Sequence, residues 1–374
     1  MSGAIVKGWC PSAYRPMLSG DGLLVRVKPR LARLTAAQAT ALPDLANRFG
    51  NGVIDLTSRA NLQLRGVTEA DHAALLEALL AADLIDPDPQ IEERRSIVTA
   101  PLWQAGDRTE RLTLALTARL ADFPDLPGKM GFAVDAGRLP MLTGVSGDIR
   151  FETSDAGLIL RAEGARLGRV VEEDAAIDAA IELAEWFVDT GGRERGRMAR
   201  HLAHHLLPKA WQTAEPAPSM GHPIPGPAIG GHVVGVPFGA IEADDFAALI
   251  DATDARHIRV TPWRLLFLEN AARPAHPAFI HTPGDPLLDV AACPGTPRCS
   301  SAEVETRPIA RRLAEKVQGT LHVSGCAKGC ARRNPAAVTL VGQGGRFDLV
   351  ENGRASDTPC RTGLTEADLM ELFP

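Results

Sequence analysis

Cysteines are the residues of this sequence best able to bind a metal. The chain has six, and four of them fall within 38 residues, in the order Cys-x5-Cys, 26 further residues, and Cys-x3-Cys. These four are Cys293, Cys299, Cys326 and Cys330. Four thiolates are what a [4Fe–4S] cluster needs, one for each iron. The spacing therefore predicts a cluster-binding site in the last quarter of the chain.

Zinc is the main competitor for four cysteines, because a tetrahedral zinc ion takes the same ligands. Zinc ribbons, however, favour Cys-x2-Cys or Cys-x4-Cys spacing, whereas the irons of a cluster are spread over a cube. Gly325 and Gly329 directly precede the last two cysteines. Backbone N–H groups at these glycines can approach cluster sulfides closely. The pattern favours a cluster over zinc and over four unrelated thiols.

Composition excludes some classes of partner. The 374 residues carry a net charge of −6, so no global basicity points to nucleic acid. No apolar stretch approaches the roughly 20 residues of a membrane span, and the N-terminus lacks the apolar run of a secretory signal. Clustered cysteines in a reducing compartment are more often metal ligands than disulfides. We therefore expect a cytoplasmic protein.

An internal repeat organises the chain around these cysteines. Hydrophobic periodicity and turn residues predict a strand at 22–29, a helix at 35–49, strands at 53–56 and 61–67, and a helix at 69–80. The order strand, helix, strand, strand returns at 231–237, 243–251 and 257–270, and residues 54–64 align with 258–268 at a constant offset of 204. This is the β-α-β-β pattern of a ferredoxin-like unit, present twice.

Three segments resemble the sulfite and nitrite reductase family. They are the cluster box Ser324-Gly325-Cys326-Ala327-Lys328-Gly329-Cys330, the box Thr57-Ser58-Arg59-Ala60-Asn61-Leu62-Gln63, and Leu126-Pro127-Gly128-Lys129-Met130-Gly131. The resemblance covers nearly the whole chain. It implies an α+β fold with duplicated ferredoxin-like half-domains, two reductase-type α/β cluster-domain halves and a pseudo-two-fold axis.

This resemblance divides the chain into five segments. We expect a ferredoxin-like half-domain at 1–85, a cluster-free reductase-type domain at 86–211, a Pro/Gly linker at 212–231, a second half-domain at 232–285, and the cluster-binding domain at 286–374.

The chain departs from the reductases at two places. Gly128 and Gly131 stand where the reductases use basic residues, which argues against a small anionic substrate such as sulfite or nitrite. The glycines would instead leave room for oxygen over a macrocycle. The opening Trp9-Cys10-Pro11, residues 16–26, and residues 292–302 resemble the precorrin-3B synthases, the oxygen-dependent members of the same superfamily.

The resemblance implies both a reaction and its participants. Precorrin-3A is hydroxylated at C20, and a ring A acetate closes into a γ-lactone. Molecular oxygen and an external electron donor are consumed. Beside the [4Fe–4S] cluster, a mononuclear non-haem iron is implied, although its ligands cannot be identified. A tetrapyrrole substrate would occupy the place that sirohaem takes in the reductases, its carboxylates held by arginine.

Most of the candidate site residues lie in the matching boxes. Arg65 lies two residues beyond the first box, and Arg94 and Arg95 fall where the resemblance implies an arginine. We expect Lys129 and Arg59 in a catalytic role, and we expect the substrate to be bound by Arg59, Asn61, Gln63, Arg65, Arg95 and Lys129. A weaker candidate for an iron site is a group of three histidines at positions i, i+3 and i+4 of a predicted helix, namely His201, His204 and His205. Cys10 is expected to be a buried structural thiol.

Two other functions stay open at this point. One is a sirohaem-dependent sulfite or nitrite reductase, and the other is a non-catalytic iron–sulfur electron carrier. The carrier is disfavoured because a duplicated fold of this size is large for that role.

Overall fold

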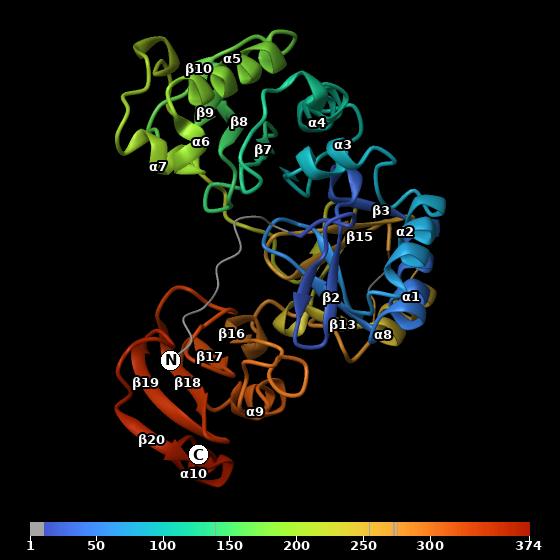
Figure 1. The fold of residues 1–374 in the computed structure, drawn as a ribbon, viewed down its shortest axis with the longest axis vertical. Coiled ribbons are helices and arrows are strands. Elements are labelled where there is room, and N and C mark those ends of the chain that lie inside the picture. The colour runs from blue at the N-terminus through green and yellow to red at the C-terminus, as the bar shows by residue number, and fades with distance from the viewer. Residues whose placement is uncertain (1–10, 139, 254, 272–273, 275) are drawn as a thin grey trace.

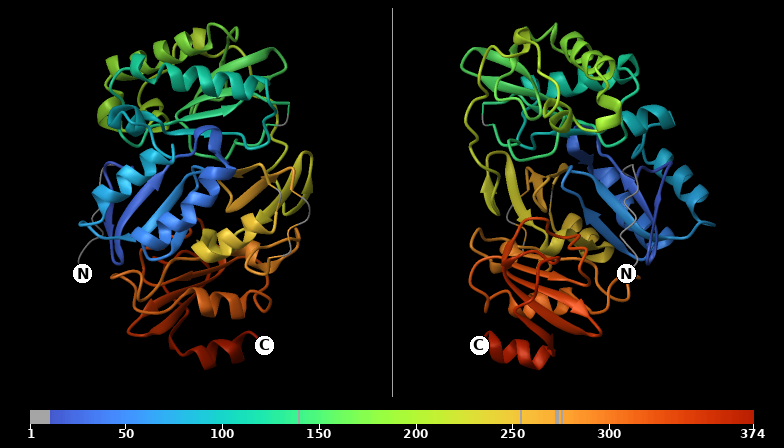
Figure 2. Two further views of the ribbon diagram at one scale, coloured as in Figure 1. Left: turned by 90° about the vertical axis from the view of Figure 1, so that its right-hand side faces the viewer. Right: turned by 60° about the vertical axis from the view of Figure 1, so that its left-hand side comes forward.

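The computed structural model describes residues 11–138, 140–253, 255–271, 274 and 276–374. The fold stacks three layers along its longest axis (Figure 1). The two ferredoxin-like halves form the middle layer, and one reductase-type domain lies at each end. Two further views show the same order, with the last domain below the central layer (Figure 2). The duplicated α+β fold predicted from the sequence is confirmed.

The first central sheet has the order β1-β2-β5-β4-β13. Its strands are Met17–Ser19 (β1), Gly22–Val27 (β2), Leu62–Val67 (β5), Val53–Leu56 (β4) and Ala240–Glu242 (β13). Helices α1 (Ala36–Phe49) and α2 (His72–Ala81) belong to this half. Thr35 and Gln38 form a capping box that fixes the start of α1.

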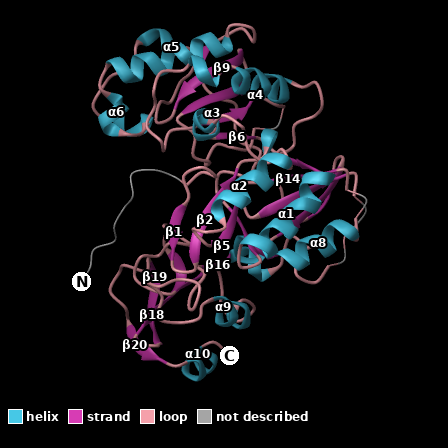
Figure 3. Cartoon of the chain, turned by 45° about the vertical axis from the view of Figure 1, so that its right-hand side comes forward, coloured by secondary structure: helices cyan, strands magenta, loops and turns pink. Residues whose placement is uncertain are grey.

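The second central sheet has the order β11-β12-β15-β14-β3. Its strands are Gly226–Ala228 (β11), Gly231–Gly235 (β12), Leu265–Glu269 (β15), His257–Val260 (β14) and Arg33–Thr35 (β3). Strand β11 lies within the segment 212–231 predicted as a linker. Helix α8 (Ala243–Asp251) packs against α1 (Figure 3). The Asn47 amide donates to Asp244 at 2.8 Å across that contact.

The two halves exchange one strand each. β3 comes from the first half but pairs with β14, while β13 comes from the second half and pairs with β4. The offset of 204 also holds in the backbone: Ala60 and Arg264 both have left-handed φ values, of 54° and 61°. Each of these residues lies in the turn between the two paired strands of its half.

The first outer domain contains a sheet in the order β10-β9-β8-β7-β6. Its strands are Ile97–Thr99 (β6), Phe132–Asp135 (β7), Ile149–Ser154 (β8), Gly157–Ala162 (β9) and Arg169–Val170 (β10). Its helices are α3 (Pro89–Arg94), α4 (Arg108–Ala118), α5 (Ala176–Asp189), α6 (Gly192–Arg195) and α7 (Met198–Leu202).

The second outer domain repeats this topology in the order β16-β17-β18-β19-β20. Its strands are Val290–Ala292 (β16), Leu321–Ser324 (β17), Ala336–Gln343 (β18), Arg346–Gly353 (β19) and Arg361–Leu364 (β20), and its helices are α9 (Arg307–Leu313) and α10 (Glu366–Leu372). In both sheets three parallel strands are followed by two antiparallel ones.

Short 3-10 helices complete the chain at Arg30–Ala32 (η1), Leu120–Asp122 (η2), Lys209–Trp211 (η3), Pro237–Gly239 (η4) and Pro286–Asp289 (η5). Among the described residues, no helix is long and apolar enough to cross a membrane.

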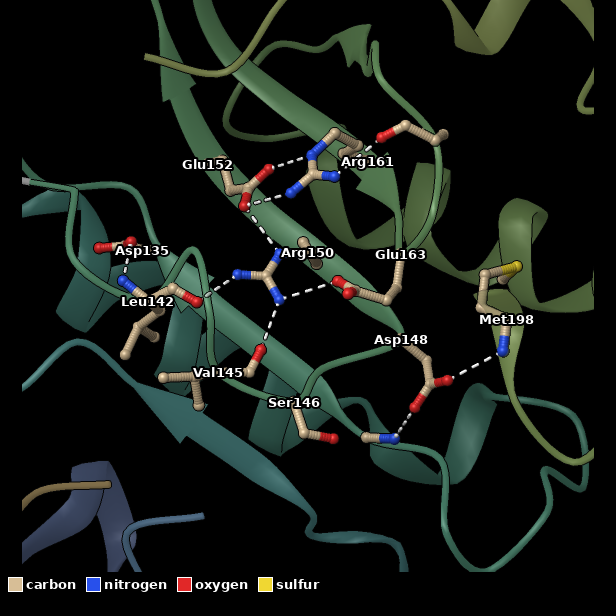
Figure 4. A network of polar contacts seen from close by, with 12 residues as sticks. Asp135, Leu142, Val145, Ser146, Asp148, Arg150, Glu152, Arg161, Glu163 and Met198 are labelled. Carbon is tan, nitrogen blue, oxygen red and sulfur yellow. Dashed lines mark hydrogen bonds and ion pairs between the residues drawn. The ribbon is translucent and has the colours of Figure 1, made fainter. Parts of the chain in front are cut away.

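A buried arginine organises the first outer domain (Figure 4). Arg150 on β8 is fully buried and donates to Glu152 at 2.7 Å, to Glu163 at 3.0 Å, and to the carbonyls of Leu142 and Val145. Burial of Glu152 opposes its ionisation, but the hydrogen bond from Arg161 and the charge of Arg150 outweigh it and lower the pKa of Glu152. The buried guanidinium of Arg150 therefore ties the segment 142–145 to strand β8.

Loss of the Arg150 side chain should lower the stability of this domain. Arg150→Met leaves the buried carbonyls of Leu142 and Val145 without this donor and removes one of the two arginines that pair with Glu152, so we expect the free energy of unfolding to fall by about 3–5 kcal/mol. Urea denaturation followed by circular dichroism measures it. Arg119→Met is the matched control, because Arg119 pairs with Asp122 and Asp178 at the exposed surface. Equal urea midpoints for the two variants would contradict a structural role for the buried network.

Candidate functional site

The four clustered cysteines converge at one edge of the last sheet. Cys293 directly follows β16, and Cys326 follows β17 after one glycine. These strands are parallel neighbours, with Ala292 opposite Val323, so their carboxyl ends meet. Partial burial and the charges of Cys326, Cys293 and Cys299 all raise the pKa of Cys330, with Lys328 opposing them. All four thiols therefore lie within electrostatic range of one another.

The backbone around these thiols is shaped to approach sulfur. The Gly325 N–H donates to Cys293 Sγ at 3.1 Å, and Gly329 has a left-handed φ of 60°. A Cβ at Gly325 would lie 2.5 Å from the Ala302 Cβ, so only glycine fits there. The Thr306 hydroxyl donates to the Cys293 carbonyl and holds the first ligand segment. Four convergent thiols with a backbone amide directed at one sulfur fit a [4Fe–4S] cluster.

The described residues hold no ready-made site for a single metal ion. Among them no three His, Cys, Asp or Glu side chains, the four clustered cysteines included, lie close enough together to bind one ion directly. Ligands for a mononuclear iron are thus not assembled among these residues. Cys10 lies outside the described residues.

The histidine candidate differs from its prediction. Helix α7 ends at Leu202, so His204 and His205 lie beyond it, and the expectation of one helix carrying all three is wrong. His201 is buried, shares a 2.7 Å hydrogen bond with Thr190 and stacks on His205. Burial lowers the pKa of His201, with the charges of His205 and Arg195 adding to the effect.

A cavity of about 860 Å³ lies against the cysteines. Both central half-domains and the last outer domain contribute to its wall. Cys293 and Cys330 line one side, while Arg26, Gln63 and Arg65 come from the first half-domain. Trp263 and Arg264 come from the turn between β14 and β15, and Arg307 from the start of α9. The volume is in the range of sites that enclose large organic ligands.

Arg65 lines this cavity from the first half-domain. It is 5% exposed, and its guanidinium donates to Asp21, Asp55 and Ser19. Burial opposes its charge, but Asp55 and Asp21 outweigh burial and raise the pKa of Arg65. The hydrogen bonds of Arg65 are therefore all made within the protein.

The other predicted substrate residues are placed differently. Gln63 lines the cavity and accepts from Arg26, whereas Asn61 lines a small neighbouring cavity of about 50 Å³. Arg59 donates to Ser96, to Ser146 and to the Lys129 carbonyl. Arg95 is buried, pairs with Glu92 and donates to the Lys28 carbonyl. None of Arg59, Arg95 and Lys129 lines the 860 Å³ cavity, and their binding roles stay predictions.

The two glycines of the 126–131 box also have a different setting. A Cβ at Gly131 would lie 2.6 Å from the Ser96 carbonyl oxygen, and the Gly131 N–H donates to Asp148. Close packing against Ser96 therefore requires glycine at 131. Neither Gly128 nor Gly131 lines the large cavity, so the expectation that they leave room for oxygen there finds no support in the geometry.

Three further residues at the site, Arg264, Arg307 and His322, were not predicted from the sequence. Arg264 donates to the carbonyls of Leu288 and Val290, which fixes the segment that leads into β16. Arg307 lines the cavity from α9. His322 on β17 is fully buried, and burial together with Arg332 lowers its pKa to about 4, so it is neutral. The 204-residue offset could have identified Arg264 as the counterpart of Ala60.

Comparison with known proteins agrees with this architecture. Residues 15–82 match the family described as nitrite/sulfite reductase ferredoxin-like half domain. The ferredoxin–nitrite reductase of Synechococcus elongatus is 23% identical over 91% of this chain and 80% of its own length. The solved structure of Mycobacterium tuberculosis NirA has a TM-score of 0.63 at 18% identity, and the match covers 93% of this chain and 79% of that one, which shows a shared fold.

A precorrin-3B synthase from Sinorhizobium sp. is more similar. It is 34% identical, over 94% of this chain and 84% of its own length. Identity at this level over nearly the whole chain, on a duplicated fold with four convergent cysteines beside a large cavity, shows that the chain belongs to the precorrin-3B synthase family of the nitrite/sulfite reductase superfamily.

Proposed function

We propose that this protein is an oxygen-dependent oxidoreductase that converts precorrin-3A to precorrin-3B. The observation that carries the proposal is the cavity of about 860 Å³, with Cys293 and Cys330 on one wall and arginines on the others. It is large enough for a tetrapyrrole, and guanidinium groups suit its carboxylates. The similarity to a precorrin-3B synthase supports the same substrate.

The cluster ligands in this proposal are Cys293, Cys299, Cys326 and Cys330. A bound [4Fe–4S] cluster supplies single electrons at the cavity wall. The protein's own contribution is to hold the thiols through Gly325 and Thr306, and to orient the substrate by its carboxylates. An external electron donor and molecular oxygen are required as co-substrates. Free thiols persist in a reducing compartment, which supports the cytoplasmic location expected from the sequence.

A sirohaem-dependent reductase is the second candidate, because the nitrite reductases align over most of the chain. The two functions differ in what occupies the cavity after purification. In the first it is empty and receives the substrate, whereas in the second it holds sirohaem permanently.

Anaerobic purification followed by turnover separates these functions. We expect a broad iron–sulfur absorption without a sirohaem Soret or α-band, and conversion of precorrin-3A to precorrin-3B when oxygen and reductant are added. Mass spectrometry of the product measures the added oxygen. A sirohaem spectrum together with reduction of nitrite or sulfite would overturn the proposal. A cluster spectrum without turnover would favour an electron carrier.

Removal of one cysteine ligand tests the cluster. Cys326→Ala should lose the visible absorption and the tightly bound iron, because alanine supplies no ligand to the iron that Cys326 would bind. Wild type should carry about four irons and four sulfides per chain, measured by metal and sulfide analysis.

Cys360→Ala is the matched control for this experiment. Cys360 is exposed, and its thiol donates to the Leu349 carbonyl. This variant should keep its iron. Zinc in place of iron in freshly purified wild type, or a full complement of iron retained by Cys326→Ala, would argue against the cluster.

A further inference from the structure

Four arginines line the proposed tetrapyrrole cavity, and they differ in what their donors already bind. Arg65 donates to Asp21, Asp55 and Ser19, and Arg264 donates to two backbone carbonyls. Arg26 donates to the side-chain oxygen of Gln63. Each of these three guanidinium groups therefore already donates hydrogen bonds to groups of the protein.

Arg307 is different from the other three. Within the described part of the chain it makes no hydrogen bond, and its Nε is buried without a partner. The nearest carboxylate oxygen, Asp55 Oδ1, lies 3.6 Å from Nη2, beyond good hydrogen-bond distance. The other oxygen of Asp55 binds Arg65 at 2.9 Å. Asp55 thus attracts Arg307 electrostatically without satisfying its donors.

Burial makes this arrangement costly for the empty protein. The Arg307 side chain is 16% exposed. Burial lowers its pKa, with Asp55 opposing and the nearby charges of Arg298 and Arg65 adding to the effect. A guanidinium keeps its charge in proteins, so the cost is carried as unsatisfied donors in a poorly solvated place. A carboxylate entering the cavity can accept two parallel N–H bonds from such a group.

We propose that Arg307 is the anchor for one carboxylate of the bound tetrapyrrole. This inference rests on the proposed function, because it requires a polycarboxylate in the cavity. It also places the anchored carboxylate beside the cluster ligands. Arg307 directly follows Thr306, whose hydroxyl holds the Cys293 carbonyl. The segment Thr306–Arg307 would then both bind the substrate carboxylate and hold the backbone of Cys293.

Arg311 provides a matched control on the same helix. It is exposed, and its guanidinium lies over the Phe238 ring, 5.3 Å from the centroid. It lines a neighbouring cavity of about 570 Å³ but not the larger one. Arg311→Met therefore removes the same charge from α9 without touching the proposed anchor.

The experiment measures binding of uroporphyrin, a porphyrin with eight carboxylates, by fluorescence titration of the anaerobic holoenzyme. We expect Arg307→Met to raise Kd roughly 10- to 100-fold, the loss typical of hydrogen bonds to a charged partner. Arg307→Lys should fall in between, because lysine keeps the charge but not the paired donors. Arg311→Met should bind like wild type. The amide derivative of the porphyrin should bind wild type and Arg307→Met alike.

Stability of the ligand-free protein gives a second readout. Truncation of an arginine that stabilises the fold lowers the stability of the protein, whereas truncation of a buried cation with unsatisfied donors does not. We therefore expect the thermal midpoint of ligand-free Arg307→Met to equal or exceed that of wild type. A lower midpoint, or failure of this variant to fold, would contradict the proposal and assign Arg307 a structural role.

The uroporphyrin titration separates a wrong binding site from a wrong anchor residue. If uroporphyrin does not bind wild type, the tetrapyrrole site itself is wrong, and the proposed function falls with it. If wild type and Arg307→Met bind uroporphyrin equally, only the anchor is wrong and the proposed function stands.

Discussion

The guanidinium of Arg65 is the contact on which the site depends. It joins β5 to Asp55 on β4 and to Asp21 in the turn between β1 and β2. The same turn presents Gly20 to the last domain, where a Cβ would lie 2.2 Å from the Ser300 nitrogen and 2.9 Å from Cys299 backbone atoms. The buried guanidinium of Arg65 thus positions both the cavity wall at Asp55 and the turn at Asp21, which packs against the loop that carries Cys299. Its partners are two carboxylates, so each of these contacts joins opposite charges.

The second half-domain carries the same ion pair with the charges reversed. At the 204-residue offset, Asp55 and Arg65 correspond to Arg259 and Glu269, which also form a salt bridge. Arg259 then donates to the carbonyls of Pro101 and Trp103, and its guanidinium lies 3.9 Å from the Trp103 ring centroid. The ion pair of the first half-domain thus lies at the wall of the 860 Å³ cavity, whereas its counterpart in the second half-domain contacts residues of the first outer domain.

The sequence predicted the central layer well, because its elements obey local rules. The helix predicted at 35–49, the strand at 53–56 and the helix at 243–251 follow from hydrophobic periodicity, and all three are confirmed. Strand β8 was not predicted, because buried Arg150 and Glu152 break its apolar pattern. The exchanged strands β3 and β13 are three residues long, too short for any pattern to show which sheet they join.

The site was predicted in part for similar reasons. Cysteine spacing is specific, so it identified the ligand set without a structure. The arginines were harder, since the chain has 40 Lys and Arg residues and sequence does not reveal which of them are buried. Arg59 and Arg95 matched or adjoined family motifs, yet their donors bind protein groups. Arg307 belongs to no repeat or motif, and only its lack of a hydrogen-bond partner in the described structure distinguishes it.

Exchange of β3 and β13 means that each half completes the sheet of the other. Two separate copies of a single half would complete each other's sheets in the same way, as a symmetric dimer with a self-complementary interface. Joining two such copies into one chain preserves the contact and ends the requirement that they stay identical. From then on, one copy can keep its metal ligands while the other loses them and gains a packing role. The strand exchange thus fits an origin by duplication, in which a protein with one site keeps a two-fold arrangement of its halves.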